Sequence, residues 1–150
     1  ARTMRYEDTV ILHKDFHVAT ETTIAYVLEH YGRPFLEELF ERTAQRVYRE
    51  IHQSLVSGDY EPLLEHWRYY YEREDGEYRV EHTDGGVDFI VLDCPAVRHV
   101  IERHGSVDER FYLQFELLCA GFSEGTPFDI SFTKHAPTSY TYHIRHSDEA

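Results

Sequence analysis

The chain has 150 residues, a common size for one domain built around a single core. Hydrophobic residues make up 41% of the chain and charged residues 29%, a composition that excludes disordered and fibrous proteins. The 28 acidic and 15 basic side chains give a formal net charge of −13, which repels phosphate backbones and anionic lipid headgroups. We therefore expect neither nucleic acid nor a membrane among the partners of this protein.

The N-terminus has none of the features of a signal peptide. No run of about 18 apolar residues is present, and Ala1–Met4 lacks the charged and apolar regions of a signal peptide. We expect a cytoplasmic protein that folds as one α+β domain over residues 1–150, and we leave a homo-oligomer open. Residues 1–9 are expected to be a flexible or vector-derived N-terminus, since Met4 could be the natural start.

Three helices are predicted in the first half of the chain. Apolar residues at helical spacing predict a first helix that ends near Tyr31, where a Gly-Arg-Pro sequence supplies a stop and a restart. The same spacing predicts a long amphipathic helix over Pro34–Ser57, with the proline in its first turn. After a break at Gly58, residues 60–72 are predicted to form a third helix.

Strands are predicted mainly in the second half. Glycine-containing turns at 75–76 and 84–86 bound strand-forming residues, which predicts a β-hairpin over 78–82 and 87–92. Helices before and between antiparallel strands, without a βαβ alternation, predict an α+β fold in which N-terminal helices pack on a small, mainly antiparallel sheet. The other predicted elements are short helices over 95–104 and 107–120 and strands over 128–132 and 140–144.

Cys94 and Cys119 are the only cysteines, too few for a disulfide framework. Cys94 ends a hydrophobic strand and directly precedes Pro95, a favoured first helical residue, so its thiol is expected at the positive end of a helix dipole. Such a position lowers the pKa of a thiol and favours a nucleophile or a metal ligand. The alternative for either cysteine is a small buried residue that serves only packing.

Two histidines near the N-terminus form a second candidate group. His13 and His17 are four residues apart and share one face of a helix that begins early, and apolar residues continue this face. We therefore expect both imidazoles to point into the protein, with Asp15 orienting one of them. Such a pair can transfer protons near neutral pH, or bind a divalent metal together with a carboxylate. The alternative is a pair of hydrogen-bonded core or surface histidines.

Several short motifs resemble the L-2-amino-thiazoline-4-carboxylic acid hydrolase family. They are Asp-Cys-Pro-Ala at 93–96 with the helix after it, Cys119 before a glycine, and the strand at 126–132. The opening at 12–17 is similar to small uncharacterised proteins related to that family. The resemblance spans most of the chain and implies hydrolysis of a carbon–nitrogen bond in a small heterocycle, with the cysteine at position 94 as the functional residue. This chain has Tyr-Thr-Tyr at 140–142, where family members often carry a further cysteine.

Three functions follow from these candidates. The leading hypothesis is a small-molecule hydrolase of a C–N bond in a heterocycle or amide, in which Cys94 attacks or assists and His13 or His17 moves protons. The first alternative is a non-catalytic module that encloses a small molecule among aromatic side chains. The second alternative is an enzyme with a divalent metal at His13 and His17; otherwise no metal or cofactor is expected. The side chains expected to contact the substrate are Tyr31, Trp67 and Cys119.

Overall fold

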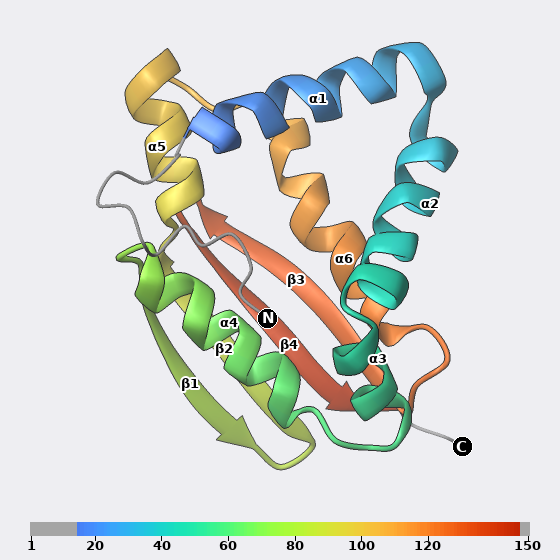
Figure 1. Ribbon diagram of the computed structural model, residues 1–150. Helices are drawn as coiled ribbons and strands as arrows, with labels where there is room; N and C mark the ends of the chain where they lie inside the picture. Colours follow the sequence, from blue (N-terminus) through green and yellow to red (C-terminus); the bar gives the residue numbers. More distant parts are fainter. Residues whose placement is uncertain (1–14, 148–150) are drawn as a thin grey trace, which may run out of the picture.

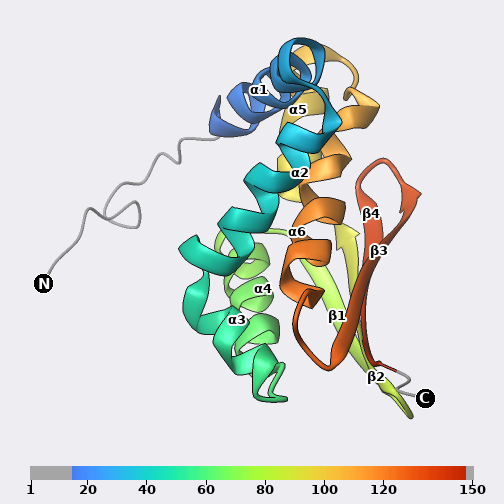
Figure 2. The same cartoon turned by 90° about the vertical axis from the view of Figure 1, so that its right-hand side faces the viewer.

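A four-stranded antiparallel sheet with helices along one face forms the described part of the computed structural model, residues 15–147 (Figures 1 and 2). The strand order is β1-β2-β4-β3, and every neighbouring pair is antiparallel. This arrangement confirms the α+β fold predicted from the sequence. The strands are β1 (Glu77–Thr83), β2 (Gly86–Asp93), β3 (Phe128–Ala136) and β4 (Ser139–His146).

The helices lie against the inner face of this sheet, while Figure 2 shows no described helix on its outer face. The predicted end of the first helix near Tyr31 is confirmed, as are the β1–β2 hairpin and the helix after Cys94. No helix among residues 15–147 is long and apolar enough to cross a membrane. The helical segments are α1 (Asp15–Tyr31), α2 (Arg33–Arg42), the π-helical η2 (Thr43–Val47), α3 (Arg49–Val56), α4 (Glu61–Arg73), α5 (Pro95–His104), the 3-10 turn η3 (Glu109–Tyr112) and α6 (Leu113–Ser123).

The prediction of one uninterrupted helix over Pro34–Ser57 is wrong in its middle. The chain widens into the π-helical segment η2 and then leaves helical geometry at Tyr48, where φ is −104° and ψ is 42°. This irregularity lies where the chain crosses α6, and Ala44 is fully buried at the crossing. Apolar spacing alone does not distinguish a straight helix from one with a π-helical turn, because the buried face continues through the irregular segment.

The helix predicted over 107–120 also differs in its boundaries. It begins with the 3-10 turn η3, and α6 continues past Gly121 to Ser123. Gly121 is a contact residue and not a helix stop, since a Cβ atom there would lie 2.9 Å from the Cβ of Ala44 and 3.1 Å from the Cα of Glu41. The glycine therefore permits the close approach of α6 to the α2–η2 segment.

The main core lies between α4, α6 and the inner face of the sheet. Side chains alternate along the strands, so that Val87, Phe89 and Val91 of β2 and Tyr140 and Tyr142 of β4 point inwards and are buried. Complete burial of a large apolar side chain contributes roughly 1.5–3 kcal/mol, and this layer therefore supplies much of the stability that fixes α4 on the sheet. A smaller cluster holds α1 and α2 on α6; its buried members are Ile24, Val27, Leu36 and Leu117.

Candidate ligand-binding site

An aromatic cavity of about 190 Å³ lies between the helices and the inner face of the sheet. A cavity of about 150 Å³ is large enough to hold benzene, so this one accommodates a single ring with a small substituent. Its walls come from α1, α4, α6 and β4, with Tyr48 between η2 and α3. The residues that line the aromatic cavity are Phe16, His17, Tyr48, His66, Trp67, Tyr70, Tyr71, Gln114, Phe115, Leu118, Cys119, Phe122 and Tyr142.

Helix α4 and strand β4 supply the inner wall because of their residue spacing. Two pairs of residues four apart, one helical turn, lie on the same face of α4. They are His66 with Tyr70 and Trp67 with Tyr71. The Trp67 ring stacks on Tyr142 of β4, with centroids 4.2 Å apart and planes inclined by 6°. The indole is only 6% exposed, so stacking and burial together fix this wall.

His17 is the polar group that α1 contributes. Its side chain is buried as predicted, and its Nε2 lies 3.0 Å from Oε1 of Glu74, the capping residue directly after α4. When Nε2 donates its hydrogen to this carboxylate, the Nδ1 atom of the neutral ring is free of a proton and can accept one. Glu74 was missed by sequence reasoning because 57 residues separate it from His17 and nothing in the acidic sequence around it marks a partner.

Cys94 is at the N-terminus of α5, as predicted, but its thiol is completely buried. Burial raises the pKa of this thiol and outweighs the Tyr140 hydroxyl and the backbone N–H groups of Val97 and Ala96, which act in the opposite direction. The prediction of an acidified thiol is therefore wrong. The N-terminus of α5 lies where it was expected, but burial raises the pKa of the thiol by more than the helix dipole lowers it.

Three tyrosine hydroxyls connect Cys94 with the wall of the cavity. The Tyr140 hydroxyl donates to Sγ of Cys94 at 3.0 Å, and its oxygen lies 2.5 Å from that of Tyr71. The Tyr71 oxygen lies 3.3 Å from that of Tyr142. Burial raises the pKa of all three phenols, so they stay protonated at neutral pH. Cys94, Tyr140, Tyr71 and Tyr142 are called the hydroxyl chain below; the last two of them line the aromatic cavity, whereas Cys94 does not.

Three of the predicted site residues meet at the cavity. His17, Trp67 and Cys119 line it together, although they come from three different helices. Burial, with a smaller contribution from Glu116, raises the pKa of the Cys119 thiol far above its ordinary value, so this wall residue is neutral. Sequence reasoning missed His66, whose pKa is lowered by burial and whose position one residue before Trp67 was the available signal.

Among the remaining predicted site residues that the structure describes, Asp15 and Tyr31 do not line this cavity. Asp15 forms an ion pair with Arg103 at 2.6 Å and lies 3.5 Å from Nε2 of His99, so it faces α5 and not His17. Tyr31 is 59% exposed and stacks on Phe35, with ring centroids 5.0 Å apart. His13 lies outside the described residues. In the described range, no three His, Cys, Asp or Glu side chains are grouped so that they could hold a metal ion.

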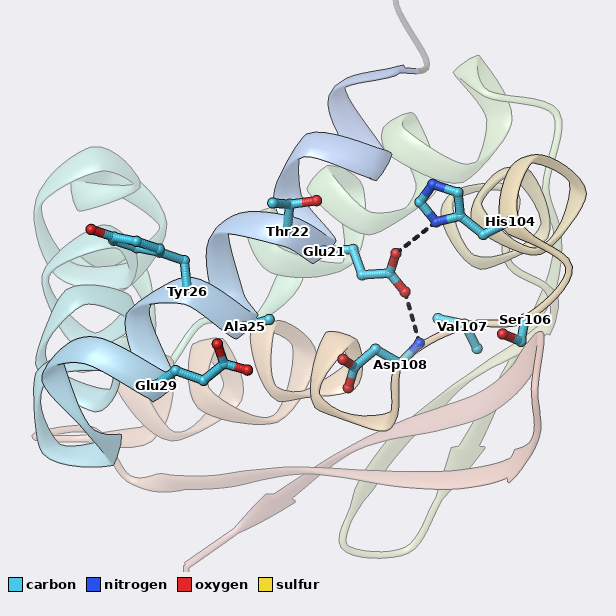
Figure 3. Close-up of a pocket in the computed structure, with 9 residues that line it drawn as sticks. All are labelled: Glu21, Thr22, Ala25, Tyr26, Glu29, His104, Ser106, Val107 and Asp108. Atoms are coloured by element: carbon cyan, nitrogen blue, oxygen red, sulfur yellow. Dashed lines mark hydrogen bonds and ion pairs between the residues drawn. The ribbon is translucent and has the colours of Figure 1, made fainter.

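A larger, shallow pocket of about 580 Å³ lies on the surface between α1 and the loop after α5 (Figure 3). Its buried carboxylate, Glu21, hydrogen-bonds His104 Nδ1 at 3.1 Å and accepts from the backbone N–H of Asp108 at 2.7 Å. Arg110 in turn pairs with Asp108 and Glu29. These partners tie α1 to the loop, so the acidic groups of this pocket serve the structure.

Comparison with known proteins identified no matching family model, curated protein or solved structure.

Proposed function

We propose that this protein binds a small organic molecule, of the size of a single ring, in the aromatic cavity. The observation that carries the proposal is the cavity itself, about 190 Å³ of partly open space bordered by aromatic rings at the edge of the core. Protein interiors are close-packed, and an unfilled space of this size costs stability, which a bound ligand would offset. A mainly apolar wall with a few convergent polar groups is the usual composition of a ligand site.

The wall offers two kinds of contact to such a ligand. The rings of Trp67, Phe115 and Phe122 offer stacking and edge contacts, which contribute about 0.5–1.5 kcal/mol for each aromatic pair beyond the area buried. The His17–Glu74 pair and the tyrosine hydroxyls offer hydrogen bonds that would orient the ring. Cys119 adds a small, neutral surface between them.

Trp67 provides the test because it is the only tryptophan of the chain and lines the cavity. Titration with single-ring compounds should change its fluorescence in a saturable manner. The variant Cys119→Phe fills the cavity and should abolish this change. The variant Leu39→Phe introduces the same ring on the exposed surface of α2 and should leave it intact. If no single-ring compound binds, or if Cys119→Phe binds as the parent does, the proposal is refuted.

Hydrolysis of a C–N bond in the bound molecule is a second candidate, favoured by His17. This imidazole lines the cavity and has a carboxylate partner, the arrangement of a general base that takes a proton from water. The oxygen of that water would attack the carbon of a cyclic amide, and the proton would pass to the departing nitrogen. Cys94 would then assist through the hydroxyl chain and would not itself attack, consistent with the resemblance of the 93–96 motif to a hydrolase family.

Ring opening can be measured directly because it adds the mass of one water to a cyclic amide. We expect the protein to open five- or six-membered cyclic amides, and His17→Ala to remove this activity while ligand binding persists. His30→Ala serves as the control, since His30 is an exposed histidine that does not line the cavity. Intact substrate after prolonged incubation with the parent protein, or full activity of His17→Ala, would exclude this candidate.

A further inference from the structure

The direction of hydrogen bonding in the hydroxyl chain is set at Cys94. Each phenol has a single proton to donate, whereas a thiol is a weak donor. The sulfur of Cys94 lies at the N-terminus of α5, where the backbone N–H groups of Ala96 and Val97 favour negative charge on it. Sulfur in such surroundings accepts, and the Tyr140 hydroxyl donates to it at 3.0 Å.

The donation from Tyr140 to Cys94 determines the direction of the other two hydrogen bonds in the chain. Because the proton of Tyr140 points to Cys94, the oxygen of Tyr140 accepts from Tyr71, 2.5 Å away. The proton of Tyr71 is then committed, so its oxygen accepts from Tyr142 at 3.3 Å. In this arrangement each of the three protons is donated along the chain in the direction of Cys94. Tyr142, at the end of the chain, is left with an oxygen that can accept but not donate.

Gln114 adds a further hydrogen-bond acceptor to the cavity wall. The side-chain amide of Gln114 donates one of its two hydrogens to the carbonyl oxygen of Phe111 at 3.0 Å, and its carbonyl oxygen can accept a hydrogen from a ligand. Among the described residues, no Lys or Arg side chain lines the cavity. The net charge of −13 further opposes an anion. In the described part of the chain, a carboxylate ligand would therefore find no Lys or Arg partner at the cavity.

We propose that the aromatic cavity selects a neutral ring that carries an N–H or O–H donor, and that Tyr142 is the specificity-determining residue which accepts this hydrogen. The inference depends on the proposed ligand-binding function and adds the chemical class of the ligand. Cys94 acts in it as a positioning residue, because it orients the tyrosine protons through the chain and does not touch the ligand.

Four probes of similar size test this polarity by titration calorimetry. They are phenol, a donor; toluene, an apolar isostere; pyridine, an acceptor at pH 7.5; and benzoate, an anion. We expect phenol to bind at least about tenfold more tightly than toluene or pyridine, since a buried acceptor left without a partner is unfavourable. Benzoate should not bind. Toluene or pyridine binding as tightly as phenol would overturn the selectivity and leave ligand binding itself standing.

Substitutions in the hydroxyl chain then test whether it causes the preference for phenol. Tyr142→Phe removes the acceptor and keeps the ring, so toluene should become the preferred ligand. Tyr78→Phe is the matched control, because the Tyr78 hydroxyl bonds to Glu72 outside the cavity and its loss should not change the ranking. Cys94→Ala frees the proton of Tyr140 and permits the chain to reverse, which should improve pyridine binding.

These results separate ligand binding in the cavity from the donor selectivity set by the hydroxyl chain. An unchanged pyridine affinity in folded Cys94→Ala would contradict control of the polarity by Cys94. If phenol, toluene and pyridine all fail to bind the parent protein, the ligand-binding function is refuted and the selectivity with it. The ranking of the probes by the parent protein needs no variant, so it stands as a test even if a substitution prevents folding.

Discussion

Cys94 and Cys119 show how burial decides the chemistry of a residue. Sequence reasoning placed Cys94 correctly at a helix N-terminus, because the Cys-Pro pair after a hydrophobic strand is a local signal. It could not supply the solvent exposure of the sulfur, which depends on β4 and α4 packing over it. Tyr140 lies 46 residues away in the sequence, and no local pattern connects it with Cys94.

The two thiols are expected to be unreactive in the folded protein. Burial raises the pKa of both, and the Cys94 sulfur also has no solvent contact. In native buffer at pH 7, iodoacetamide should modify neither cysteine within the time that modifies both in urea. Mass spectrometry of peptides after timed quenching measures this. Fast modification of Cys94 in the native protein would contradict the buried, protonated thiol and restore the sequence-based expectation of an activated one.

At the scale of elements, the crossing of α6 with α2 and η2 was not predictable. Apolar spacing located the buried faces, and the predicted ends at Tyr31 and Gly105 agree with the structure because glycine at a helix end has a local cause. Gly121 resembled such an end in the sequence. Its use in a helix–helix contact depends on a partner about 75 residues earlier in the chain, for which a single sequence contains no signal.

Substitution of Gly121 by alanine tests this crossing. Alanine normally stabilises a helix interior relative to glycine, but here its Cβ atom would lie 2.9 Å from Ala44, and overpacking of this kind costs about 1–3 kcal/mol. We expect a lower free energy of unfolding in urea. Gly85→Ala is the control, since a Cβ atom at Gly85 meets nothing within 4 Å. Equal stability of both variants would show that α6 does not approach η2 so closely.

Strand pairing on the outer face gives a prediction of pH dependence. Burial raises the pKa of Asp88 on β2, but hydrogen bonds from His143 and Arg145 of β4 outweigh it and hold the pKa below its ordinary value. A lowered folded pKa contributes stability above the unfolded pKa of about 3.9, and this stability is lost as the pH falls through the folded value. Asp88→Asn should therefore be less stable than the parent at pH 7, and the difference should shrink below about pH 4.

Urea unfolding at several pH values measures this difference. Asp84→Asn, in the exposed β1–β2 turn, is the matched control and should show little change at any pH. A difference between Asp88→Asn and the parent that stays constant down to about pH 2 would mean that the carboxylate charge is not what links β2 to β4.

At the scale of the whole molecule, composition and the order of helices and strands were sufficient to predict the α+β class. Of the predicted site residues, His17, Trp67 and Cys119 line one cavity, whereas Cys94, Tyr31 and Asp15 do not. Helical periodicity indicates which residues point inwards. It does not indicate which inward residues surround empty space, because the cavity exists only once α1, α4, α6 and β4 have all assembled.

Because the cavity depends on the whole fold, ligand binding should stabilise the whole fold. A ligand that binds only the folded state at about 100 times its Kd adds about 2.7 kcal/mol to the free energy of unfolding. A saturating single-ring donor such as phenol should therefore move the urea midpoint upwards without changing the slope of the transition, since the surface exposed on unfolding stays the same. The midpoint of Cys119→Phe, whose added ring occupies the cavity, should not respond to the ligand. A shift of equal size in this variant would place the bound molecule elsewhere on the protein.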